Sequence, residues 1–343
     1  MNSRPLRLLF ITQKVHGQDA FGLLWARSFQ RLGYDVAILC LEDRHTQGAA
    51  LLGEEMTFPV YSMGKEKGRG KFLQVTAFLW YIITLPYDRV FIHMTPVWMV
   101  FGSGLWLFKR TAVYLWYTHY KMQLGVRLFM LFGKRAFCAT EQSLPQYGGS
   151  PKKIVTGHGI DLQYWPRRGN LCSDPRKLLG VYRFSRSKRV ELCIRAMMLL
   201  PECTLDMYGI PAEPQYVTEL QNLIAHLHLE HRVQIHSTVA AKELAGLYQQ
   251  HRLMLNMASE TIDKTMLEAM TCGCYPVTTS RNATAIGIPV APAIETPEAI
   301  AACITECLQR SPLYPEAMYD VVAEHHSLDR LTRTMDRYIR SGT

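Results

Sequence analysis

The sequence predicts an α/β protein built from two Rossmann-like domains that face a central cleft. Three observations lead to this prediction: the chain has 343 residues, apolar strand-like runs alternate with amphipathic helix-like runs, and the alternation occurs twice. A chain of this length exceeds one ordinary hydrophobic core. Regular alternation of strands and helices favours doubly wound parallel sheets, whose ligands bind beyond the carboxyl ends of the strands.

The first alternation occupies residues 1–165. The apolar run Leu6–Thr12 predicts a buried strand, and Phe21–Leu32 predicts a helix that turns at Gly33 into a second strand. Further strands are expected at RVFIHM, AVYLWYTH, AFCAT and KIVTGHGI. A charged amphipathic pattern near the C-terminus predicts a helix that could fold back onto either domain, and we assign 326–343 to the first.

The second alternation occupies residues 166–325. Strands are expected at KLLGVYRF, TLDMYG, RVQIHS, LMLNMA and YPVTTS, with helices between them. After the strand that ends at Ala258, Lys264–Thr271 predicts an amphipathic helix closed by Gly273. The start of this helix is the first candidate for a ligand site, because a helix N-terminus offers free N–H groups to a diphosphate.

Two acidic residues, Glu260 and Glu268, lie on either side of this helix start and are separated by seven residues. Placed there, Glu260 can hydrogen-bond the hydroxyls of a sugar, and Glu268 can accept two hydrogen bonds from a ribose diol. The alternative interpretation is that both are solvated charges on an exposed helix face.

A pair of basic residues, Arg183 and Lys188, lies where the first strand of the second domain meets its helix. A guanidinium can engage phosphate oxygens through two hydrogen bonds, and an ammonium acts as a point charge. Fixed cations of this kind stabilise the negative charge that develops on a departing diphosphate, so no metal is expected. The alternative is a pair of surface charges at the junction.

Positive charge is concentrated in the first half of the chain. Residues 1–165 hold 19 Lys and Arg against 10 Asp and Glu, whereas residues 166–343 hold 19 of each class. This asymmetry favours an anionic partner for the first domain. A basic loop, 65–71, precedes an uncharged, aromatic-rich segment that suits docking on an anionic bilayer; a core helix behind a solvated loop is the other interpretation.

Other features exclude several classes of protein. The apolar stretch Val90–Phe108 is about as long as a membrane span, but His93, Pro96 and two glycines divide it into a strand and a short helix. The N-terminal apolar run is too short for a signal peptide. Nine scattered cysteines without metal-site spacing predict reduced thiols and a cytoplasmic location. The basic residues form no nucleic-acid reader motif.

These motifs resemble family 4 glycosyltransferases, a retaining, nucleotide-sugar-dependent class with the GT-B fold. The resemblance covers nearly the whole chain and is strongest from Val155 to Pro276. Glu260 and Glu268 match the family's E-x7-E signature, and Arg183 and Lys188 match its Arg-x4-Lys pair.

The resemblance implies further site residues. Gly17 falls at the second glycine of the family's Gly-Gly turn, where the backbone of the first domain would approach the phosphates. His119 takes the place of the family's active-site histidine in the first domain; a neutral core histidine is the alternative. Asp263, Lys264 and Thr265 begin the site helix and would bind the donor, although Lys264 also suits a solvated first turn.

Several residues depart from the family pattern. Tyr182 and Arg189 replace glycines next to the Arg–Lys pair, and His16 replaces the first glycine of the Gly-Gly turn. Asp263 stands where the family often has a glycine close to the donor sugar. Asp263 and His16 therefore leave the identity of the sugar open.

The function expected from these observations is retaining transfer of a hexose from a nucleotide diphosphate sugar to an acceptor glycan or glycolipid, with no cofactor. The basic first half suggests a lipid-linked or polysaccharide intermediate as acceptor and a peripheral position on the inner membrane face. Three alternatives stay open: a non-catalytic nucleotide-sugar-binding protein, a GT-B epimerase, and a soluble small-molecule glycosyltransferase.

Overall fold

The chain divides into two compact units in a computed structural model, which describes residues 4–16, 21–44, 58–165, 167, 172–259, 262–289, 291–292, 294–310 and 315–343. The first unit comprises residues 1–159 and 328–343, and the second comprises 160–327. The sequence placed the divisions at 165 and 326. Ile160 belongs with the second unit because it pairs with Ser327 through an isolated β-bridge.

The described part of the first unit contains a seven-stranded parallel sheet with the order β3-β2-β1-β4-β5-β6-β7. Its central strands β4 and β5 are nearly continuous runs of buried residues, as expected for a parallel sheet covered on both faces. The strands are β1 Leu6–His16, β2 Tyr34–Arg44, β3 Val60–Ser62, β4 Arg89–His93, β5 Ala112–Trp116, β6 Ala136–Cys138 and β7 Lys153–Val155.

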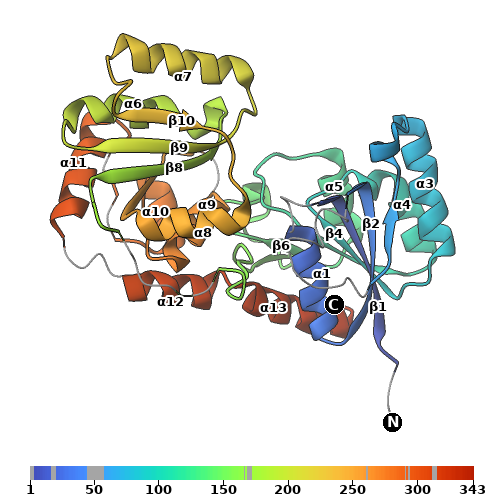
Figure 1. Ribbon diagram of the computed structural model, residues 1–343. Coiled ribbons are helices and arrows are strands. Elements are labelled where there is room, and N and C mark those ends of the chain that lie inside the picture. Colours follow the sequence, from blue (N-terminus) through green and yellow to red (C-terminus); the bar gives the residue numbers. More distant parts are fainter. Residues whose placement is uncertain are drawn as a thin grey trace. The chain divides into compact units, whose positions relative to one another are not determined.

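Helices cover the two faces of this sheet (Figure 1). The helices α3, α4 and α5 pack on one face, and α1 and α13 pack on the other. Short 3-10 turns lie at Lys65–Lys67 and Pro145–Tyr147. The helices are α1 Phe21–Arg31, α3 Lys71–Thr84, α4 Trp98–Phe108, α5 Leu124–Phe132 and α13 Leu328–Ser341.

The apolar stretch Val90–Phe108 forms β4 and α4, as the interrupting residues predicted. None of the helices in the described ranges combines the length and the apolar character that a membrane crossing requires. Strands β1 and β2 extend beyond their apolar cores, because Lys14 pairs with Glu42 and Val15 with Asp43 along the two strands. Hydropathy alone stops these strands too early.

The second unit contains, within its described residues, a five-stranded parallel sheet with the order β10-β9-β8-β11-β12. Its strands are β8 Lys177–Arg183, β9 Thr204–Ile210, β10 Val233–His236, β11 Leu253–Asn256 and β12 Tyr275–Thr278. Its helices are α6 Val190–Ala196, α7 Pro214–His226, α8 Ala241–Gln250, α9 Lys264–Thr271, α10 Ser280–Ile286, α11 Pro297–Gln309 and α12 Pro315–His325, with 3-10 turns at Arg186–Lys188 and Met197–Leu199. The prediction of two parallel-sheet α/β domains is confirmed.

Candidate functional site

A pocket of about 200 Å³ lies in the second unit, at the carboxyl ends of β8 and β9 and beside the start of α9. This is the edge of a parallel sheet where ligands bind in doubly wound folds. Five residues singled out in the sequence line it: Arg183, Lys188, Asp263, Lys264 and Thr265. The remaining lining residues are Val181, Tyr182, Tyr208, Gly209, Ile210, Thr238, Val239 and Leu244.

Arg183 is the last residue of β8, and its side chain is exposed at the pocket. Among the described residues, none forms a hydrogen bond or ion pair with its guanidinium. The buried residues of β8 anchor the strand in the core, so the position of Arg183 is set by a rigid element. Its donors are therefore available to an anion that enters the pocket.

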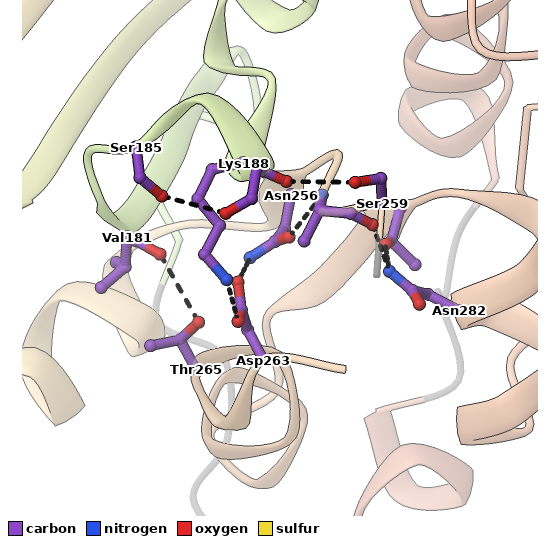
Figure 2. Close-up of polar contacts among 11 residues, drawn as sticks. Val181, Ser185, Lys188, Asn256, Ser259, Asp263, Thr265 and Asn282 are labelled. Carbon is purple, nitrogen blue, oxygen red and sulfur yellow. Dashed lines mark hydrogen bonds and ion pairs between the residues drawn. The ribbon is translucent and has the colours of Figure 1, made fainter. Parts of the chain in front are cut away.

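Lys188 ends the 3-10 turn that follows β8, and its ammonium forms an ion pair with the carboxylate of Asp263 (Figure 2). Both side chains are largely buried, with 13% and 18% of their surfaces exposed. The amide nitrogen of Asn256 donates to the other oxygen of Asp263 at 2.9 Å. The side-chain amide oxygen of Asn256 in turn accepts a hydrogen bond from the backbone N–H of Ala258 at 3.1 Å. Asp263 is thus held from two sides.

The first turn of α9 faces the pocket through Lys264 and Thr265. Asp263 is the residue before the helix, with extended backbone angles, yet its carboxylate makes no hydrogen bond to the helix backbone. The carboxylate turns toward Lys188 instead. The positive end of the helix dipole therefore remains uncapped by this side chain and is suited to binding an anion.

Glu268 lies one turn further along α9 and is not among the residues that line the pocket. Burial raises its pKa to about 7, and the nearby Lys264 ammonium partly opposes this shift. The Tyr248 hydroxyl lies close enough to affect the pKa of Glu268, but it makes no hydrogen bond of normal geometry with a described residue. Tyr164 also lies within electrostatic range of this carboxyl. Glu268 is thus half-buried beside aromatic side chains, and part of its surface stays accessible.

The other predicted site residues lie elsewhere. His119 belongs to the first unit, where it follows β5 in an exposed position with its ring 5.5 Å from that of Tyr117. The alternative of a buried core histidine is therefore wrong. Gly17 and Glu260 lie outside the described residues. Among the residues that the structure describes, no three His, Cys, Asp or Glu side chains are grouped so that they could hold a metal ion.

Two residues with clear roles at the pocket were not predicted from the sequence. Asn256 is fully buried and positions Asp263; its signal was a polar residue at the carboxyl end of an apolar strand. Tyr182 lines the pocket and donates its hydroxyl to the carbonyl of Leu255 at 2.6 Å, which ties β8 to β11. A tyrosine at this position therefore has a structural use.

Arg189 adopts left-handed backbone angles, with φ 48° and ψ 45°. This conformation explains why a glycine suits the position, since only glycine adopts it without steric cost. Here the contacts of the arginine side chain offset this steric cost, because its Nε donates to the carbonyl of Met257 at 2.9 Å and its guanidinium pairs with Glu295.

A segment of the second unit matches a known protein family. Residues 164–287 match the model of glycosyl transferases group 1, a range that contains the whole pocket. Among curated proteins, none matches this sequence.

Solved structures match almost the whole chain. A structure of HepE (Alr3699) from Anabaena in complex with UDP-glucose has a TM-score of 0.76 at 16% identity and covers 98% of this chain and 100% of its own. A glycosyltransferase from Rickettsia africae has a TM-score of 0.76 at 16% identity, with 99% of each chain covered. Sucrose-phosphate synthase from Thermosynechococcus elongatus has a TM-score of 0.75 at 14% identity, with 98% of each chain covered. The chain therefore has the GT-B fold of these structures, and residues 164–287 in its second unit match the model of glycosyl transferases group 1.

Proposed function

We propose that this protein transfers a hexose from a nucleotide diphosphate sugar to an acceptor hydroxyl, with retention of the anomeric configuration. The observation that carries the proposal is the pocket in which Arg183, Lys188 and the start of α9 converge at the carboxyl end of β8. The match to glycosyl transferases group 1 supports it, as does the similarity to HepE with bound UDP-glucose. A UDP-sugar is accordingly the first donor to test.

In the proposed reaction, the bond between the anomeric carbon and the diphosphate oxygen breaks, and its electron pair leaves with the nucleotide diphosphate. The acceptor oxygen forms the new bond on the same face of the sugar, and its proton passes to an oxygen of the departing phosphate. Arg183 and Lys188 stabilise the negative charge that develops on the diphosphate, so the reaction needs no metal or cofactor. Backbone N–H groups at Lys264 and Thr265 add to this stabilisation.

The remaining residues take supporting roles. Glu268 accepts hydrogen bonds from the ribose diol, and Glu260 orients the sugar rather than acting as a nucleophile. Gly17 lets the backbone of the first unit approach the phosphates. His119 guides the acceptor hydroxyl. These roles follow the resemblance to the family, with each residue at its matching position.

The proposed acceptor is a lipid-linked or polysaccharide intermediate at the cytoplasmic face of a membrane. The basic character of the first half supports it, because intermediates of this kind lie at an anionic surface. A non-catalytic nucleotide-sugar-binding protein has one observation in its favour: the charge of Lys188 is already neutralised by Asp263.

Thermal unfolding in the presence of UDP-, GDP- and ADP-sugars tests donor binding, since a ligand that binds only the folded chain raises its stability. We expect one nucleotide series to raise the unfolding temperature. Arg183→Ala should abolish most of this shift and lower the transfer rate by roughly 100- to 1,000-fold.

Arg176→Ala is the matched control, because Arg176 is an exposed arginine of the same unit that lies outside the pocket. Donor binding without release of free nucleotide, with or without acceptor, would favour the non-catalytic alternative. Turnover that requires no acceptor would indicate an epimerase or a hydrolase.

A further inference from the structure

Exposed apolar side chains gather on one part of the first unit. Of the 17 large hydrophobic residues that are exposed in the described chain, 12 lie in or directly next to α3, α4 and α5. The most exposed are Phe72 at 79%, Trp80 at 66%, Phe108 at 86%, Leu124 at 62% and Leu131 at 68%. Single exposed apolar residues are normal on a protein surface, but a cluster of this kind marks an interaction site.

These three helices are apolar on both sides. Their inner sides already fill the core against one face of the sheet, for example through Phe78, Trp106 and Phe129. The core therefore does not explain the apolar residues on their outer sides. α4 contains no charged residue at all. A helix that is hydrophobic all round belongs in a core or against a membrane, and the outer side of α4 is exposed.

The helices lie together and form one continuous face. α4 contacts both α3 and α5, and Figure 1 shows α3 and α4 side by side. The ammonium of Lys109, just after α4, donates to the carbonyl of Ile82 in α3 at 3.3 Å. The face consists of the outer sides of α3, α4 and α5 and is called here the apolar helix face.

The charges around the apolar helix face are almost all positive. The segments that carry these helices, 67–84 and 98–134, hold eight Lys and Arg residues and no acidic residue, and Asp88 lies between the two segments. Asp88 is already paired, because Arg4 and Arg7 donate to its carboxylate at 3.1 and 3.0 Å. Lys71 at the start of α3 and Arg110 after α4 are exposed. An occupant of this face must therefore be both apolar and anionic.

We infer that the apolar helix face docks on an anionic phospholipid bilayer, with its aromatic side chains among the acyl chains and its cations at the headgroups. Such interfacial binding combines burial of apolar area with attraction to anionic lipids. A second copy of this chain fits less well, because a two-fold interface would bring the same cations of both copies together. The inference deepens the proposed function, because it names the part of the protein that would bind the membrane in which the acceptor lies. It rests on the proposed function for the identity of that acceptor.

Vesicle flotation of the full chain tests this inference. We expect binding to vesicles of phosphatidylcholine with phosphatidylglycerol, weaker binding at high salt, and little binding to phosphatidylcholine alone. Trp80→Ser combined with Phe108→Ser should weaken binding at least tenfold. The matched control is Met198→Ser combined with Leu199→Ser, since these residues are 53% and 51% exposed in the second unit. Lys67→Glu combined with Lys71→Glu should also weaken binding.

Several outcomes would overturn the inference. These are no flotation with anionic vesicles, equal flotation of the Trp80 and Phe108 variant, and a concentration-dependent dimer that the same variant abolishes. The last result would assign the face to a second copy. Thermal unfolding of each variant establishes that it is folded. Nucleotide binding measured on the natural chain separates the two proposals. Flotation on anionic vesicles without nucleotide binding would contradict the donor chemistry, and nucleotide binding without flotation would contradict the membrane face.

Discussion

Asp263 lies where an anion would meet the start of α9. Its carboxylate pairs with Lys188, accepts from Asn256 and makes no hydrogen bond to the helix backbone. A donor diphosphate that enters the pocket therefore competes with Asp263 for Lys188. At the same time the carboxylate repels the phosphates, and both effects weaken donor binding.

Asp263→Asn should consequently tighten the binding of UDP, by roughly tenfold or about 1.4 kcal/mol. The amide keeps the size of the side chain and its contact with Asn256, while it releases the Lys188 ammonium. Isothermal titration calorimetry with UDP measures the change. Asp320→Asn, which removes the same charge from an exposed position on α12, is the control. If UDP binding stayed constant while UDP-sugar binding weakened, Asp263 would be a ligand of the sugar and not a competitor of the phosphate.

The raised pKa of Glu268 predicts a pH dependence of donor binding. Only the carboxylate form accepts two hydrogen bonds from a ribose diol, and the pKa lies at about 7 in the folded chain. Binding of UDP should therefore strengthen as the pH rises from about 6 to 8. Glu268→Gln should bind UDP more weakly than the natural chain at high pH, and its affinity for UDP should not increase between pH 6 and pH 8. Titrations of both proteins at several pH values provide the measurement.

The raised pKa of Glu268 also makes the stability of the fold depend on pH. Stability should fall as the pH rises, whereas UDP binding should strengthen. The folded chain holds the Glu268 proton more tightly than the unfolded chain, whose carboxyl has the ordinary pKa of 4.5. The contribution of Glu268 to stability is thus largest at low pH and is lost as the pH rises from about 4.5 to about 7. The unfolding temperature of Glu268→Gln should therefore rise, relative to that of the natural chain, as the pH increases from 5 to 8. The absence of any such gain would contradict the burial of this carboxyl.

At the scale of elements, the sheet architecture could be predicted because parallel strands are continuous apolar runs between helices. At two places the local sequence pattern did not predict the secondary structure or its role completely. The outer parts of β1 and β2 contain charged residues, so hydropathy ended both strands early, although Lys14 pairs with Glu42. The segment after the basic loop suited two interpretations, because α3 is apolar on its inner and outer sides.

The site shows the same division between local and long-range information. Arg183 and Lys188 are close in sequence, as are Asp263, Lys264 and Thr265, so each group could be recognised as a motif. Tyr208 and Thr238 could not, because they reach the pocket only through the strand order β10-β9-β8-β11. Asn256 positions Asp263 from the end of β11, and hydrogen bonds of this kind leave no periodic signal.

At the scale of the whole molecule, the chain returns to its first unit through α13. Leu331, Met335 and Ile339 are fully buried in the core of that unit. Polar contacts add to this packing, since Tyr34 donates to Asp336 at 2.7 Å and Tyr114 donates to the carbonyl of Tyr338 at 3.0 Å. The last residues of the chain thus stabilise the first unit, whereas the pocket belongs entirely to the second.

Met335→Ala should separate these two properties. Removal of a fully buried methionine side chain costs about 2–5 kcal/mol of unfolding free energy, so the first unit should unfold at a lower temperature. UDP affinity should not change, because no residue of α13 lines the pocket. Arg333→Ala, an exposed position on the same helix, should leave both properties unchanged. Calorimetric unfolding and UDP titration on the same samples measure them. A joint loss of stability and affinity would mean that the second unit depends on the first for its fold, and the division into two self-contained units would be wrong.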